Sequence, residues 1–369
     1  MMMTPFNRIR LARREMLEAA ASLGGIAALQ GMGTVFGMMA RPAQAQGTGS
    51  VTSLRSTSKS WLWAAEDYGV ARKHFESGGL TVEQASTQRG VNHDALIGGA
   101  ADILLGSPIQ NMRVQFRDQP VVLILSMVNK FASNIVIRKE IADRLGVTEQ
   151  SPLEAKGAAL KGLKIGTTGS GGGPDQLVRW AMRRAGLNPA TDAQLTPVRG
   201  GVAMIAAMER QQIDGFCLSS PTSDIAIQRA GATYLFNMAT NPPAQLADFP
   251  YIGAAVTQET LRNKGPQLTA YCRGIALALR QIHQNPADFK TWSKGWFEGM
   301  ADDLFNVSFD NNVPIYQRDP MPTQAGFQAN VEFLDEDLKS IGQPGVPDGY
   351  TLQKAYDLRF VEQAMRQLG

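Results

Sequence analysis

The sequence predicts an α/β fold built as two lobes of similar construction, and two observations carry that prediction. Beyond residue 45 the chain alternates strand-like and helix-like segments, which is typical of mainly parallel sheets covered by helices. A strand–turn–helix–strand order also occurs twice, at 78–108 and at 185–221. With 369 residues, 44% of them apolar and 19% charged, the chain has the composition of a globular protein with a substantial core.

The first 45 residues have the pattern of an export signal. A basic start containing Arg13-Arg14 precedes an apolar, Ala/Gly-rich run at 19–39, and the small-residue sequence Ala43-Gln-Ala45 follows. We expect a signal peptide that is cleaved after Ala45 and a mature protein in the periplasm. The arginine pair favours the twin-arginine export route over the general secretory route. An uncleaved membrane anchor is the alternative, because the apolar run reaches about 20 residues.

The mature chain is close to electrically neutral and offers no metal-ligand spacing. Residues 1–45 hold five of the 36 basic and two of the 33 acidic residues, so 31 of each remain. A neutral chain gives no sign of a nucleic-acid partner. The two cysteines, Cys217 and Cys272, and three scattered histidines do not match a zinc motif. We expect two buried thiols, with a single disulfide as the alternative, and no metal or cofactor.

A glycine-rich turn at 166–173 stands before a predicted helix. It is not a P-loop, because Pro174-Asp175 occupies the place of Lys-Ser/Thr, and Pro174 also takes the sixth position of the dinucleotide fingerprint. Proline suits the first position of a helix, and Gly186 suits its end. The unpaired N–H groups at the helix start favour an anion or polar acceptor, a preference that Asp175 itself partly satisfies.

The repeat predicts where a ligand binds. Each copy contains a strand, a turn, a helix, a strand that begins near Asp102 or Asp214, and a Ser-Pro exit, and a polar turn with a helix precedes each copy. In open α/β sheets ligands bind beyond the carboxyl ends of the strands. We therefore expect four polar turns to converge on one cleft between the lobes; they lie at 57–61, 106–108, 168–173 and 219–221. Polar turns follow strands in many proteins, so this prediction depends on the same order of turns in both copies of the repeat.

Several short segments in a fixed order link the chain to a known family. They are WLWAAEDYG at 61–69, GLTVE at 79–83, ALIGGAAD at 95–102, LKGLKIG at 160–166, the glycine turn with AGL at 185–187, and Ile213-Asp214 with Pro221. Their order resembles the periplasmic solute-binding proteins of ABC importers, and more narrowly the sulfonate/nitrate/taurine-binding and thiamine-pyrimidine-synthase-like group. The resemblance covers residues 51–369 and is strongest over 56–221.

The resemblance implies the type II periplasmic binding fold, in which two crossing strands join two lobes. The first lobe would comprise 51–134 and 251–369, and the second lobe 135–250. The outward crossing would lie within 121–136 and the return near 249–252. The tail of the first lobe would be mostly helical, for example at 267–284 and 324–341. Closure of the lobes would trap a solute and present a surface to the membrane permease.

The resemblance also implies which residues line the cleft. The first lobe would contribute Ser58, Lys59, Ser60, Trp61, Gly106 and Ser107, and the second lobe Ser170, Gly171, Ser219 and Ser220. Ser126, Met127 and Tyr251 lie near the crossings and are weaker candidates. Trp61 would cover an apolar part of the solute, with core packing as the alternative. Lys59 would pair with an anionic group, with a solvated surface position as the alternative, and the aromatic residues at 292–297 would serve packing.

We therefore expect an extracytoplasmic receptor that delivers a small organic molecule to an ABC permease and its ATPase subunit and meets the membrane only through that permease. The four turns contain no arginine, so a sulfonate, a carboxylate or a polar heterocycle fits better than phosphate. We expect no catalytic residues, because no Ser-His-Asp or paired-carboxylate spacing occurs.

Two alternatives stay open. The first is an enzyme like the thiamine-pyrimidine synthases, which depend on a cysteine-rich run and a histidine where this chain has only Phe216-Cys217-Leu218. The second is a solute-sensing module of a signalling system, which would keep the same cleft.

Overall fold

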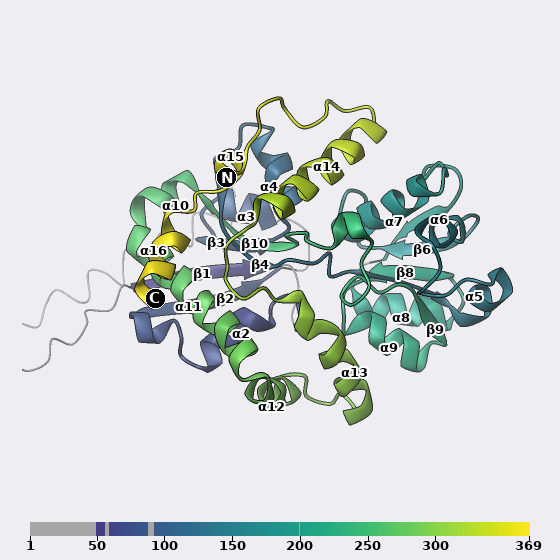
Figure 1. The fold of residues 1–369 in the computed structure, drawn as a ribbon, viewed down its shortest axis with the longest axis horizontal. Helices are drawn as coiled ribbons and strands as arrows, with labels where there is room; N and C mark the ends of the chain where they lie inside the picture. Colours follow the sequence, from purple (N-terminus) through teal and green to yellow (C-terminus); the bar gives the residue numbers. More distant parts are fainter. Residues whose placement is uncertain (1–48, 56–58, 88–91, 199) are drawn as a thin grey trace, which may run out of the picture. The chain divides into compact units, whose positions relative to one another are not determined.

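Two five-stranded sheets form the framework of the protein (Figure 1). The structure is a computed structural model and describes residues 49–55, 59–87, 92–198 and 200–369. The first sheet has the strand order β2-β1-β3-β10-β4, in which β10 runs antiparallel to both of its neighbours and β1 is parallel to β2 and β3. Its strands are β1 (Gly49–Arg55), β2 (Leu80–Ser86), β3 (Ile103–Gly106), β4 (Val121–Val128) and β10 (Ile252–Thr257).

The second sheet repeats this arrangement with the order β7-β6-β8-β5-β9. Here β6 is parallel to β7 and β8, and β5 is the antiparallel strand between β8 and β9. Its strands are β5 (Asn134–Arg138), β6 (Lys164–Thr167), β7 (Gln194–Pro197), β8 (Gly215–Leu218) and β9 (Ala232–Phe236). The prediction of an α/β fold with two halves of similar build is confirmed.

Helices connect the strands of both sheets in matching positions. In the first half these are α2 (Ala64–Ala71), the short η1 (Glu76–Gly78), α3 (Asn92–Ile97) and α4 (Pro108–Gln115). In the second half they are α5 (Lys139–Leu145), α6 (Leu153–Ala158), α7 (Gly173–Arg184), α8 (Gly201–Glu209) and α9 (Thr222–Arg229). The order β2-α3-β3-α4 thus corresponds to β7-α8-β8-α9, which is the repeat that the sequence predicts.

The chain after β10 is mostly helical, as predicted. Its elements are α10 (Gln258–Asn263), α11 (Gly265–Gln284), α12 (Pro286–Trp296), α13 (Asp302–Asn312), η3 (Val313–Ile315), α14 (Gln324–Ser340), α15 (Leu352–Ala355) and α16 (Arg359–Leu368). The longest of them, α11, buries Leu268, Ile275, Leu279 and Ile282 along one face, since residues three, four and seven apart share a side of a helix. This face packs against α2 and α16.

An aromatic cluster fills the space between α2, α12 and α13. The ring of Trp61 lies 4.5 Å from that of Phe297 and about 6 Å from those of Phe289, Phe305 and Phe309. Trp292 stacks on Trp296 at 5.4 Å beside it. The aromatic residues at 292–297 therefore serve packing, as the sequence predicts.

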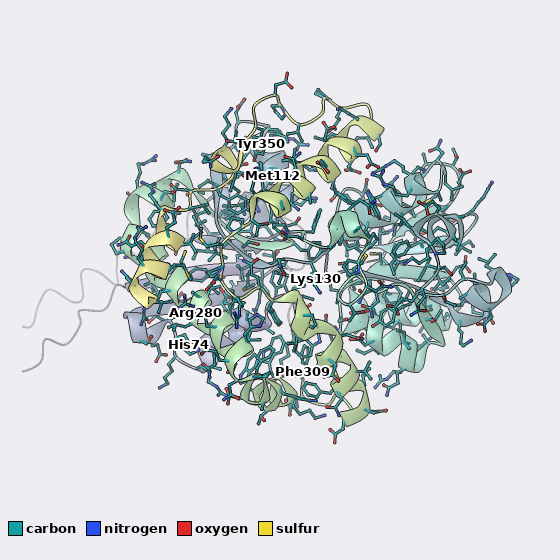
Figure 2. The ribbon with its side chains drawn as sticks, viewed as in Figure 1. His74, Met112, Lys130, Arg280, Phe309 and Tyr350 are labelled. Carbon is teal, nitrogen blue, oxygen red and sulfur yellow. The ribbon has the colours of Figure 1, made fainter. Side chains whose placement is uncertain are left out.

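The chain passes between the two sheets twice, and the two passages lie side by side. The outward passage is 129–133 and the return is 237–251, which contains the short η2 (Ala244–Leu246). The Phe249 and Tyr251 amides donate to the carbonyls of Asn129 and Val128 at 2.8 and 2.7 Å. The Lys130 ammonium on the outward passage (Figure 2) also donates to the Ala239 carbonyl on the return, at 3.0 Å. These bonds hold the two passages together.

The expected boundaries of the two lobes stay a prediction, although the described residues all belong to one compact unit. The expected signal peptide, its twin-arginine pair and its cleavage site after Ala45 lie outside the described residues. No helix of the described chain is long and apolar enough to cross a membrane. Cys217 and Cys272 are both buried free thiols, so the predicted alternative of a disulfide between them is wrong.

Candidate functional site

The four polar turns all follow the carboxyl ends of strands. The first turn comes after β1, the second after β3, the third after β6 and the fourth after β8, and each leads into a helix, α2, α4, α7 or α9. A strand that ends in a polar turn before a helix leaves unpaired backbone N–H groups at that point. The predicted site residue Ser58 lies outside the described residues, so the first turn is known from Lys59 onward.

The first turn meets the fourth turn directly. The Ser60 hydroxyl donates to the Ser220 carbonyl at 3.2 Å, and both residues are buried. Ser60 belongs to the first sheet's half and Ser220 to the second. Two residues that the sequence assigns to opposite walls of one site are therefore neighbours.

The second turn meets the third turn through α4. Gly106 and Ser107 lead into this helix, and Gln110, one turn later, donates its amide to the Gly171 carbonyl at 2.5 Å. The same amide lies 3.4 Å from Oε1 of Gln176 on α7. Sequence reasoning missed both glutamines because each lies within a helix, one turn beyond the polar segment that marks the site.

The glycine turn needs its glycines for two separate reasons. Gly169 and Gly171 have φ values of +130° and +76°, a region that residues with a Cβ rarely adopt. At Gly173 a Cβ would lie 2.9 Å from the Tyr251 hydroxyl oxygen. The turn is therefore shaped to approach the return passage closely, while Ser170 at its tip is exposed.

The start of α7 supplies its own anion. Oδ2 of Asp175 accepts hydrogen bonds from the Gly171 amide at 3.0 Å and from Nε of Arg179 at 2.8 Å. Carboxylates in the first turn of a helix are favoured by the helix dipole. The N–H groups that the sequence offers to a ligand are thus partly occupied.

Three buried hydroxyl groups lie where the fourth turn meets the two passages between the sheets. Ser133 on the outward passage is hydrogen-bonded to the hydroxyl of Ser219 at 2.9 Å and to that of Tyr251 at 2.7 Å. Burial raises the pKa of the Tyr251 hydroxyl, so this group stays a neutral donor. The predicted residues Ser219 and Tyr251 come together, and Ser133, which joins them, was not predicted.

A buried carboxylate connects the fourth turn with α13. Asp224 is 3% exposed and accepts hydrogen bonds from the hydroxyls of Ser220 at 3.2 Å and Ser308 at 2.5 Å, and from Tyr234. Burial raises the pKa of the Asp224 carboxyl, because hydroxyl groups stabilise its charge less than water does. Nε1 of Trp61 donates to Ser308 at 2.7 Å, which continues the chain of hydrogen bonds into the first half.

The remaining predicted residues have structural surroundings of different kinds. Trp61 is 1% exposed within the aromatic cluster, which favours the core-packing alternative for this residue. Lys59 is exposed at the end of the first turn. Ser126 and Met127 are fully buried in β4, and the Ser126 hydroxyl has no hydrogen-bond partner among the described residues.

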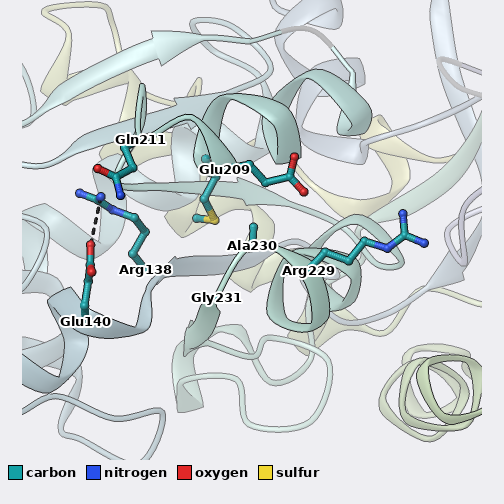
Figure 3. A pocket seen from close by; sticks show the side chains of 8 residues that line it. Arg138, Glu140, Glu209, Gln211, Arg229, Ala230 and Gly231 are labelled. Carbon is teal, nitrogen blue, oxygen red and sulfur yellow. Dashed lines mark ion pairs between the residues drawn. The ribbon is translucent and has the colours of Figure 1, made fainter.

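One surface hollow lies away from the turns. Its volume is about 500 Å³, and it is lined by residues at the end of β5 and by residues that precede β8 and β9, whereas the fourth turn follows β8 (Figure 3). Arg138 in this hollow is paired with Glu140 at 3.1 Å and with Asp214 at 2.6 Å. The cation of Arg138 is therefore already neutralised, and Arg229 is the other arginine that lines this hollow. Among the described residues no cluster of His, Cys, Asp and Glu suits a metal ion.

Comparison with solved structures identifies the fold. The ligand binding component of an ABC-type import system from Staphylococcus aureus is 10% identical, with a TM-score of 0.66 over 86% of this chain and 99% of that one. The alkanesulfonate-binding protein SsuA from Xanthomonas axonopodis pv. citri, bound to MOPS, is 13% identical, with a TM-score of 0.63 over 85% and 99%. The periplasmic nitrate-binding protein NrtA from Synechocystis PCC 6803 is 15% identical, with a TM-score of 0.63 over 88% and 89%.

These similarities show that the chain has the periplasmic binding protein fold, as the resemblance of its segments implies. A search of curated proteins finds no match. The sequence model of one family matches residues 60–291, which is more than half of the chain and includes all four turns from Ser60 onward. The chain therefore belongs to the NMT1-like family.

Proposed function

We propose that this protein is an extracytoplasmic receptor that captures a small organic molecule between its two halves and delivers it to the permease of an ABC importer. The observation that carries the proposal is a pair of contacts: Ser60 of the first turn bonds Ser220 of the fourth, and Gln110 of α4, which follows the second turn, bonds Gly171 of the third. Similarity to a component of an ABC-type import system and to sulfonate- and nitrate-binding proteins supports it.

The proposed solute contacts are mostly neutral hydrogen-bonding groups. We assign the cleft to Lys59, Ser60, Gly106, Ser107, Ser170, Gly171, Ser219 and Ser220. Hydroxyl and amide groups select a solute by the direction of its hydrogen bonds more than by its charge. This set suits a solute with one polar or singly anionic end, such as a sulfonate, a carboxylate or a heterocycle.

Capture would work by exchange of hydrogen bonds. Opening at the two passages would separate Ser60 from Ser220 and Gln110 from Gly171. A solute that enters would then take over these donors and acceptors, and closure around it would stabilise the bound state. The passages stay joined by the bonds of Phe249 and Tyr251 to the outward strand, so they serve as the axis.

The groups that an enzyme of this family would need are not in a reactive setting. Burial raises the pKa of the Cys217 thiol, whereas a nucleophilic cysteine needs a lowered value. Burial also lowers the pKa of His93, whose ring is hydrogen-bonded to Asn111 at 3.0 Å. We therefore propose that the solute is released unchanged.

The test is a ligand screen of the mature protein, residues 46–369, by thermal shift and native mass spectrometry. The panel contains alkanesulfonates, nitrate, short carboxylates and pyrimidines, and a bound solute raises the melting temperature because it binds only the folded state. Ser170→Arg should abolish the shift, since the long cation would occupy the cleft. Gln212→Arg is the matched control, because Gln212 is exposed and precedes β8, whereas the fourth turn follows it.

Either of two results would contradict this function. In the first, no small molecule shifts the melting temperature while a protein or nucleic acid does. In the second, the mass of a bound solute changes with time, which would reveal turnover.

A further inference from the structure

A second, smaller pocket lies on the seam between α9 and α13. Its volume is about 210 Å³. Ile225 and Arg229 line it from α9, Phe297 and Met300 from the segment before α13, Leu304 from α13 itself, and Lys59 from the first turn. We call it the seam pocket. It draws its walls from both halves of the protein.

The seam pocket continues outward from the buried Asp224–Ser308 contact. Ile225 directly follows Asp224, and Leu304 lies one helical turn before Ser308. Farther along the seam, Gln228 donates to Asp303 at 3.3 Å, so α9 and α13 stay in contact beside the pocket. The pocket is therefore a gap within the packed interface of α9 and α13.

The walls are apolar and the rim is cationic. Phe297 is 5% exposed and Leu304 is 7% exposed, so both present an edge to the pocket from within the core. The Lys59 ammonium and the Arg229 guanidinium are exposed, and neither has an ion-pair partner in the described parts of the chain. Glu298 is the one acidic lining residue, which leaves a net charge of one positive unit.

Arg229 belongs to this pocket more than to the larger hollow. Figure 3 shows its side chain pointing away from Arg138 and Glu140, the charged pair of that hollow. An arginine that has no carboxylate partner keeps its full capacity for bidentate hydrogen bonds to an oxyanion. This capacity distinguishes it from Arg138, which is already paired twice.

We propose that the seam pocket is a second ligand site that binds a small anion with an apolar body. It shares Lys59 with the proposed solute cleft, and its other lining residues are distinct from those of the cleft. The anionic group would lie between Lys59 and Arg229, and the apolar part would pack on Phe297, Met300 and Leu304. The volume is below the roughly 300–1,000 Å³ of drug-sized sites, so the ligand is short. Alkyl sulfonates and carboxylates of a few carbons match this chemistry.

The test uses methane-, butane- and hexanesulfonate as probes, with isothermal titration calorimetry for affinity and native mass spectrometry for the number of bound molecules. Affinity should rise about fourfold for each added methylene group that the pocket buries. Arg229→Gln should weaken hexanesulfonate binding about tenfold, as expected for a lost charge-assisted bond, and Lys59→Gln should weaken it in the same direction. Arg117→Gln is the matched control, because Arg117 is also exposed and lies outside both sites.

A comparison with Ser170→Arg separates this site from the cleft. The Ser170→Arg variant should still bind hexanesulfonate at the seam pocket but should no longer bind a solute of the cleft. The Arg229→Gln variant should still bind the solute of the cleft. Affinity that does not depend on chain length, or on Arg229, would overturn the proposal. Complete loss of hexanesulfonate in Ser170→Arg would also overturn it, because all binding would then belong to the cleft. If no cleft solute is found, binding that depends on Arg229 still establishes the seam site.

Discussion

Asp224 is a buried carboxylate at a contact between the two halves. Its carboxylate is buried, and hydroxyl groups from three elements hold it, those of Ser220, Tyr234 and Ser308. A buried carboxylate without a cation is costly when ionised, since hydroxyl donors replace only part of its hydration. The protonation state of this one group therefore influences the stability of the folded protein.

The first prediction concerns the pH dependence of stability. Burial raises the folded-state pKa of Asp224 above the unfolded value of about 3.9, so the folded protein holds this proton more tightly. The stability that protonation contributes is present below the unfolded pKa and is lost as pH rises through the folded pKa. The free energy of unfolding of the wild type, relative to Asp224→Asn, should thus fall as pH rises from about 4. Denaturant unfolding at a series of pH values measures this difference.

Asp335 supplies a control of opposite sign. Its bond to Lys339 at 2.7 Å lowers the pKa of this carboxyl, with a further contribution from the Val346 amide. The free energy of unfolding of the wild type, relative to Asp335→Asn, should therefore rise with pH as the carboxyl ionises. The first prediction would be contradicted if the unfolding free energy of the wild type, relative to each variant, changed with pH in the same direction for Asp224→Asn and Asp335→Asn.

At the scale of elements, α14 joins the two halves through two neighbouring acids. Asp337 is buried and paired with Arg113 on α4, and it accepts a hydrogen bond from Gln176 on α7 at 2.9 Å. Glu336 is partly exposed and pairs with Arg183 and Arg184 on α7. The two acids are adjacent in sequence but differ in solvent access, which makes them a matched pair.

The second prediction is that these acids differ strongly in their contribution to stability. Asp337→Asn leaves the Arg113 guanidinium without its buried partner and should lower the free energy of unfolding by about 3 kcal/mol. Glu336→Gln removes ion pairs that water already screens and should cost about 0–1 kcal/mol. Urea unfolding of both variants measures the contrast. Equal losses would show that burial does not determine the strength of these contacts.

The sequence predicted the elements and missed the contacts between them. The repeat and its four turns were visible because strands, glycines and Ser-Pro exits lie close together in the chain. The antiparallel strands β5 and β10 were not visible in the sequence, since pairing with a distant strand leaves no local pattern. Ser308 likewise lies in an ordinary amphipathic helix far along the chain, and only the fold brings it to Asp224.

At the scale of the whole molecule, one buried apolar cluster extends through both sheets. It contains Cys217 on β8 and Cys272 on α11, together with Phe131 and Phe249 of the two passages. A continuous core favours a single cooperative unfolding transition, because neither half can lose its packing without exposing the surface of the other. The two thiols lie in different halves and report on each half separately.

The third prediction follows from the positions of these thiols. In the native protein neither thiol should react with an aromatic disulfide reagent, since both are fully buried. In urea the single-cysteine variants Cys217→Ala and Cys272→Ala should become labelled at the same midpoint. Two separate midpoints would show that the halves unfold independently.

The place of β10 in the first sheet has a consequence for biosynthesis. Among the named strands of the described residues β4 pairs with β10 alone, besides isolated bridges to Tyr316 and Tyr356, and β10 also separates β4 from β3. A nascent chain that emerges from the ribosome therefore carries two strand edges that stay open until residue 257 has been made. Translation must therefore pass through the entire second half before the first sheet can close.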